Sequence, residues 1–155
     1  MVGETLDWGT LALRLGVALA SGAAIGWDRQ RSGKAAGIRT HMLVSLGACL
    51  FVLVPAAVGD PQAVSRGIQG VATGSGFLGG GVILHHMRQD EHNAAIKGLT
   101  SAAALWLTAA LGIVASCGLW RMVVLAVGAA MLVLTAGKPL ERLLFRKLSD
   151  DDDQS

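Results

Sequence analysis

The sequence predicts an all-α, polytopic transmembrane helix bundle with five spans. Hydrophobic residues make up 52% of the 155 residues and charged residues only 15%, and the mean hydropathy is +0.53. A soluble domain needs more charge than this to cover its surface. The charges also cluster in short islands between five apolar stretches. Each stretch approaches the roughly 17–25 residues that cross a hydrocarbon core about 30 Å thick.

The spans are expected at residues 11–26, 41–58, 67–84, 99–116 and 119–136. Glu4 and Asp7 precede the first stretch, whereas a signal peptide begins with a basic segment, so a retained helix is expected there. The Gly-Lys-Pro sequence at 137–139 is predicted to stop the fifth span, because proline removes a helical hydrogen bond.

The basic residues predict the orientation of these spans. Two of the 13, Arg66 and Arg121, fall on one side of the predicted membrane, and Arg14 lies inside the first span. The other ten fall on the opposite side: Arg29, Arg31, Lys34, Arg39, Arg88, Lys97, Lys138, Arg142, Arg146 and Lys147. Basic loops remain cytoplasmic, so the N-terminus is predicted outside and the C-terminus inside.

The chain is predicted to divide near residue 137. Residues 1–137 are expected to form the transmembrane domain, and 138–155 a cytoplasmic helix with an acidic tail. After Pro139, leucines recur at helical spacing among charged residues, which is typical of a short helix lying on the membrane surface.

Glycines crowd the third span. They include Gly70, Gly74, Gly76, Gly79 and Gly80. Glycine weakens a helix, so such density needs a reason. Two GxxxG steps, from 70 to 74 and from 76 to 80, predict close packing against neighbouring helices, with this helix central in the bundle. A local bend that lines a cavity is the alternative.

A polar group around the first cytoplasmic loop is the main candidate site. Its residues are Asp28, Arg29, Arg39, Thr40 and His41. Antiparallel packing of the first two spans would bring Asp28 close to Arg39, either as a structural ion pair or as part of a functional surface. Plain topology signals are the alternative interpretation.

Three further polar residues complete the candidate set. Arg14 lies about one turn inside the outer interface, where it is expected to snorkel, with a functional role as the alternative. Lys97 and Thr100 begin the fourth span. Thr100, Ala104 and Thr108 share one helical face, which suits close packing with interhelical hydrogen bonds or, alternatively, a substrate path.

Several classes of function find no support. The sequence has no P-loop, HExxH or GxSxG motif, so no enzyme is predicted. The net charge of +2 and the absence of a basic stripe predict no nucleic-acid partner. The histidines at 85, 86 and 92 match no known spacing of metal ligands, so no metal site is predicted.

Three ordered blocks resemble the MgtC/SapB family of bacterial membrane proteins. They are GIRTHMLVSLGA at 37–48, GFLGGGVIL at 76–84 and KGLTSAAALWLTAA at 97–110. The chain departs from the family at Asp28-Arg29, where Glu-Arg is usual, and many members carry a further cytoplasmic domain after the spans.

The resemblance implies a multi-pass protein of the bacterial inner membrane that serves adaptation to low Mg²⁺ and, in pathogens, survival inside macrophages. A modulator is expected that acts on a second copy or on other inner-membrane proteins within the bilayer. No cofactor is predicted, with bound Mg²⁺ as the alternative. A Mg²⁺ transporter or channel is the alternative. A pore for a hard cation usually presents carboxylates or ordered carbonyls, and the five predicted spans contain no Asp or Glu.

Overall fold

The computed structural model describes residues 7–89 and 94–152, with side chains described for 7–85 and 98–136. The predicted all-α fold is confirmed. The helices are α1 (Trp8–Arg31), α2 (Ile38–Ala57), α3 (Pro61–Gln89), α4 (Ala94–Ser116) and α5 (Trp120–Asp152).

Four of these helices are long and apolar enough to cross a membrane. They are α1, α2, the part of α3 from Pro61 to His85 and the part of α4 from Gly98 to Ser116. The apolar part of α5, Trp120–Ala136, is shorter. A multi-pass membrane protein is therefore confirmed to the extent of four candidate spans. The fifth span and the orientation remain predictions.

Local chemistry explains where the helices begin and turn. The Asp7 carboxylate accepts hydrogen bonds from the backbone amides of Gly9 and Thr10, which caps α1 and lowers the pKa of Asp7. Gly33, Gly59 and Gly118 each adopt a positive φ in the turns after α1, α2 and α4. A side chain would be strained in that conformation, so glycine ends these helices cleanly.

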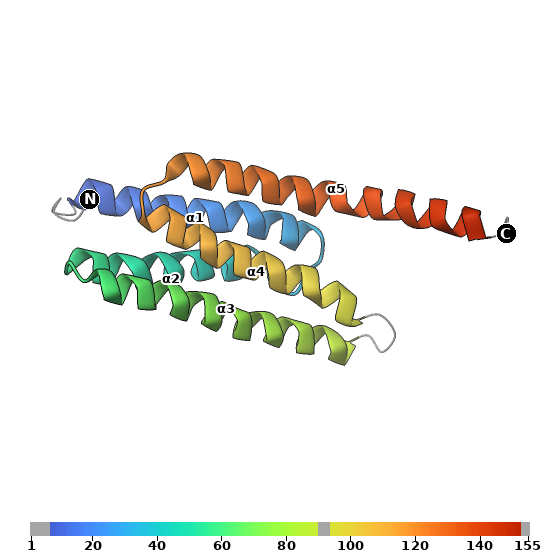
Figure 1. Ribbon diagram of the computed structural model, residues 1–155, viewed down its shortest axis with the longest axis horizontal. Coiled ribbons are helices and arrows are strands. Elements are labelled where there is room, and N and C mark those ends of the chain that lie inside the picture. The colour runs from blue at the N-terminus through green and yellow to red at the C-terminus, as the bar shows by residue number, and fades with distance from the viewer. Residues whose placement is uncertain (1–6, 90–93, 153–155) are drawn as a thin grey trace.

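The predicted break at 137–139 between the fifth span and a separate short helix is wrong, because α5 continues as one helix to Asp152. Where the membrane span ends along this helix remains a prediction. Proline at 139 removes the amide that would bond to the Thr135 carbonyl, yet the helix persists through it. Proline is similarly accommodated at Pro55 inside α2. Transmembrane helices tolerate this loss when neighbouring groups or local adjustments satisfy the freed carbonyl. In Figure 1 the C-terminal part of α5 extends past the other helices.

The packing places α2 and α4 at the centre of the bundle. Helix α4 contacts all four other helices, and among the described residues α3 packs on α2 and α4 alone (Figure 1). Half of the apolar window of α4 is buried, against 11% for α3. The prediction that the glycine-rich third helix is central is therefore wrong for the single chain.

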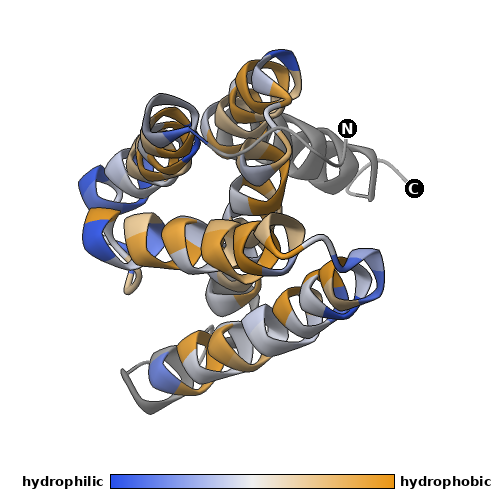
Figure 2. Cartoon of the chain, turned by 90° about the vertical axis from the view of Figure 1, so that its left-hand side faces the viewer, coloured by the Kyte–Doolittle hydropathy of each residue, from blue (hydrophilic) through white to orange (hydrophobic). Residues whose placement is uncertain are grey.

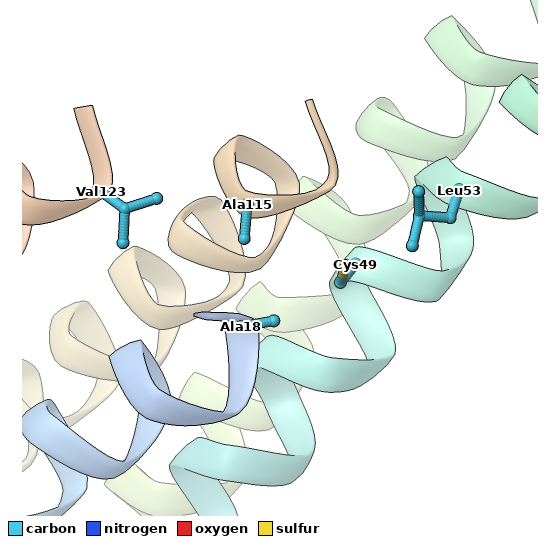
Figure 3. Packing of buried hydrophobic residues seen from close by; sticks show 5 residues of the cluster. All are labelled: Ala18, Cys49, Leu53, Ala115 and Val123. Atoms are coloured by element: carbon cyan, nitrogen blue, oxygen red, sulfur yellow. The ribbon is translucent and has the colours of Figure 1, made fainter. Parts of the chain in front are cut away.

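The apolar core joins four helices. Ala18 of α1, Cys49 and Leu53 of α2, Ala115 of α4 and Val123 of α5 form one buried cluster (Figure 3). Seen along the bundle, apolar residues also colour the outer surfaces of the helices (Figure 2). Among them Leu43, Phe51 and Phe77 are exposed, as expected where lipid replaces water as the solvent.

Candidate functional site

A buried polar cluster lies between α1, α2 and α4. It consists of Ser21 and Arg29 from α1, His41 and Ser45 from α2, and Ser101 and Thr108 from α4. The Arg29 side chain is 2% exposed and that of His41 is fully buried. Polar groups removed from water in this way must find partners within the protein.

Three hydrogen bonds join the helices in pairs. The Arg29 Nη2 donates to Ser101 Oγ at 3.0 Å, linking α1 to α4. Ser21 Oγ and Ser45 Oγ lie 3.3 Å apart, linking α1 to α2. His41 Nδ1 lies 2.8 Å from Thr108 Oγ1, linking α2 to α4. The cluster therefore joins α1, α2 and α4 to one another by side-chain hydrogen bonds.

The Thr108 hydroxyl determines the tautomer of His41. Thr108 Oγ1 donates its single hydrogen to the Ala104 carbonyl at 2.8 Å, so it can only accept from His41. His41 therefore carries its hydrogen on Nδ1, and the Nε2 lone pair remains as an acceptor. Within the described part of the chain, His41 Nε2 and the Arg29 Nε–H group are both buried without hydrogen-bond partners.

Glycines on α1 and α4 bring these helices close enough for the cluster to form. A Cβ at Gly22 would lie 2.6 Å from the His41 carbonyl oxygen, and one at Gly26 would lie 2.5 Å from the Ile38 Cα. A Cβ at Gly112 would overlap the Ser45 carbonyl oxygen. Gly22 and Gly26 form a GxxxG step, the spacing that lets two helix backbones touch.

The predicted pairing of Asp28 with Arg39 is not made. Within the described part of the chain, the ion pair found is Asp60 with Arg66 at 3.6 Å, outside this region. Asp28 is partly buried, and its Oδ2 has no hydrogen-bond partner among the described residues. Arg39 and Thr40 are exposed on the outer side of α2. The structure thus buries the next residue, Arg29, in place of the predicted pair.

The remaining candidate residues do not join the buried polar cluster as a group. Arg14 Nη1 donates to the Ser116 carbonyl at 2.9 Å, at the C-terminus of α4, where the helix dipole favours a cation. Thr108 makes the predicted interhelical hydrogen bond, whereas Thr100 is exposed. The side chain of Lys97 lies outside the described residues.

The predicted glycine packing on α3 is largely not made inside the chain. A Cβ at Gly70, Gly74, Gly76 or Gly80 would meet no described residue within 4 Å. Of the predicted set, Gly79 alone has a neighbour, with Ala102 Cβ at 3.1 Å from the Cβ position.

Sequence reasoning missed Ser21 and Ser45, although a signal was present. Ser21, Ile25 and Arg29 recur every four residues, and so do His41 and Ser45. That spacing places each set on one helical face. A polar face within an apolar span must turn toward the protein, so this periodicity would have found the cluster.

The cluster presents a fixed guanidinium, one free acceptor nitrogen and hydroxyl groups. Such a set hydrogen-bonds to polar or anionic groups readily, but it offers poor ligands to a hard cation, which prefers carboxylate and carbonyl oxygen.

Comparison with known proteins supplies the family. The MgtC family matches residues 15–143. Protein SrpB of Synechococcus elongatus is 44% identical over 151 residues, covering 92% of this chain and 83% of SrpB. The "Putative magnesium transporter YhiD" of Escherichia coli K12 is 37% identical over 148 residues, covering 88% of this chain and 63% of YhiD.

Protein MgtC of Brucella abortus is 32% identical over 123 residues, covering 79% of this chain and 49% of MgtC. The chain therefore spans about half to two thirds of the length of YhiD and MgtC and most of SrpB. No solved structure matches the chain.

Proposed function

The chain belongs to the MgtC family of bacterial membrane proteins, and on that premise we propose that it is a non-enzymatic inner-membrane protein of the response to low Mg²⁺. It acts on membrane partners, either other proteins or a second copy, and does not carry the ion. Relatives named MgtC and a magnesium-transporter name for YhiD support the link to Mg²⁺.

The buried guanidinium of Arg29 is the observation that favours a modulator over a carrier. Arg29 is 2% exposed and is held on Ser101 among the three closely packed helices. A divalent cation moving between these helices would meet this fixed positive charge at short range, where the low dielectric constant makes repulsion strong. The glycine contacts of α1 and α4 also fill the space between the backbones.

Two measurements test this proposal together. The purified full chain in liposomes, with a Mg²⁺ indicator inside, should give no faster influx than empty liposomes, while a divalent-cation ionophore gives the positive signal. A strain that lacks the gene should grow poorly at low Mg²⁺ and should be restored by the wild-type chain. Mg²⁺ influx well above that of empty liposomes would overturn the modulator.

A Mg²⁺ transporter is the second candidate, and Asp28 is the observation that favours it. Helix α1 extends to Arg31, beyond the predicted span, and so includes this carboxylate. Its Oδ2 is buried without a hydrogen-bond partner among the described residues. If the chain carries Mg²⁺, influx into liposomes should fall with Asp28→Asn and persist with the exposed Arg31→Gln.

A further inference from the structure

An open groove with a largely apolar lining runs between α2 and α3, away from the buried polar cluster. Its volume is about 870 Å³, within the range of pockets that hold whole ligands. Gly47 of α2 and Gly67, Gly70 and Gly74 of α3 line it, together with apolar side chains. The missing side chains of Gly47, Gly70 and Gly74 leave open space.

Each end of the groove carries an arginine. Arg39 begins α2 and Arg66 lies near the start of α3, so antiparallel packing places them at opposite ends. Arg66 is near Asp60, at 3.6 Å. Arg39 is exposed and has no hydrogen bond or ion pair within the described part of the chain, and the next residue, Thr40, also lines the groove.

We propose that this groove holds an anionic phospholipid, with its phosphate on Arg39 and Thr40 and an acyl chain along the glycine-lined wall. The two parts of the groove match the two parts of such a lipid. A guanidinium and a hydroxyl hydrogen-bond to phosphate oxygens, and the apolar wall accepts hydrocarbon. Basic pockets between transmembrane helices on the cytoplasmic side recognise anionic headgroups in this way.

Charge also argues against a second copy in this groove. Two copies inserted in the same orientation place their Arg39 residues in the same leaflet. A two-fold interface along the groove would bring these like charges toward each other, and none of the described residues that line the groove is acidic. An anionic lipid instead neutralises Arg39. This inference is independent of whether the protein carries or senses Mg²⁺.

Native mass spectrometry of the full chain in mild detergent tests the proposal. Phosphatidylglycerol and phosphatidylcholine with the same acyl chains are added in equal amounts. The wild type should retain phosphatidylglycerol about fivefold better, as expected for one basic contact near the surface. Arg39→Gln should remove this preference. The matched control Arg31→Gln, an exposed arginine outside the groove, should keep it.

Substitutions that fill the groove with a larger side chain test whether an acyl chain occupies it. Gly74→Leu should lower retention of both lipids several-fold without loss of thermal stability, because nothing lies within 4 Å of its Cβ position. Gly47→Leu repeats the test on the opposite wall. Glycerophosphoglycerol, the headgroup without acyl chains, should not compete, which distinguishes a lipid from a free phosphate.

Four results would overturn the proposal. The first is that the wild type retains both lipids equally. The second is that Arg31→Gln loses the preference for phosphatidylglycerol as Arg39→Gln does. The third is that both leucine variants retain lipid as well as the wild type. The fourth is that Gly70→Cys, in a Cys117→Ser background, forms a disulfide-linked dimer in high yield in lipid vesicles. That result would place a second copy in the groove.

Discussion

Helices α1 and α3 both carry glycines at four-residue spacing, yet the structure uses them differently. Gly22 and Gly26 of α1 press against the backbone of α2 and hold the buried polar cluster together. Gly70 and Gly74 of α3 face open space along a groove at the edge of the bundle. The α1 glycines share their helix with the buried residues Ser21 and Arg29, whereas most of α3 is exposed.

This difference teaches that a GxxxG step permits a close contact but does not specify one. On α1, buried polar side chains lie on the same helix as the glycines that make the contact. Polar side chains within the membrane must turn inward to find partners. Glycines on the same face of the helix then also face the bundle and can contact a neighbouring backbone.

The largest expected effect comes from adding a side chain at each kind of glycine. Gly22→Leu should cost more than about 3 kcal/mol of stability, because the new Cβ collides with the His41 backbone, which cannot move aside. Gly74→Leu should leave stability near that of the wild type. Thermal unfolding and size-exclusion profiles of detergent-extracted protein measure both. Equal behaviour of the two variants would break the comparison.

The second effect compares a buried and an exposed arginine. Arg29→Ala leaves a cavity and strands Ser101, so it should cost about 2–4 kcal/mol. Arg39→Ala, at an exposed position, should change stability by less than about 0.5 kcal/mol. Unfolding of the two variants in the same detergent compares them. Greater loss from Arg39→Ala would indicate that Arg39, not Arg29, belongs to the structural core.

A smaller effect is expected from the two threonines of α4. Thr108→Val removes the acceptor for His41 Nδ1–H and should cost about 1 kcal/mol. Thr100→Val, on the exposed surface, should cost close to nothing. A double-mutant cycle with His41→Ala isolates the pair. Additive single effects would show that His41 and Thr108 do not interact.

The last comparison is between the chemical labelling of the two cysteines, and it involves no change in stability. Cys49 is fully buried and Cys117 is exposed in the turn between α4 and α5. A membrane-impermeant thiol reagent added outside intact spheroplasts should label Cys117 and spare Cys49, with Cys117→Ser as the control. Labelling of Cys117 only after the cells are opened would reverse the predicted orientation.

The fold was largely predictable because the thickness of the bilayer determines the length of a spanning apolar helix. Four apolar stretches of spanning length became four long helices, and the turn at Gly59 lies where the Gly-Asp-Pro sequence ends the second stretch. The end of the fifth helix was not predictable from proline alone. Proline costs a hydrogen bond, but whether that ends a helix depends on what surrounds the freed carbonyl.

The site was predictable only in part. Arg29 and His41 were among the candidates, but Asp28 was paired with Arg39 because both lie at helix ends. Adjacent residues on an α-helix point about 100° apart, so Asp28 and Arg29 face different neighbours. Which of them enters the bundle depends on the rotation of α1 against α2. The close contacts of Gly22 and Gly26 with α2 fix that rotation, and it cannot be predicted from which residues lie near the loop.

The length of α5 has a mechanical consequence. At 1.5 Å per residue, the part from 137 to 152 adds about 24 Å to a helix whose apolar part already approaches the bilayer thickness. Within the described part of the chain, α5 rests on α1 and α4. A long helix that is supported near one end moves most at its other end. A tilt of about 10° at its support would move the far end sideways by about 4 Å over that length. Small displacements within the membrane would therefore be magnified at the tip.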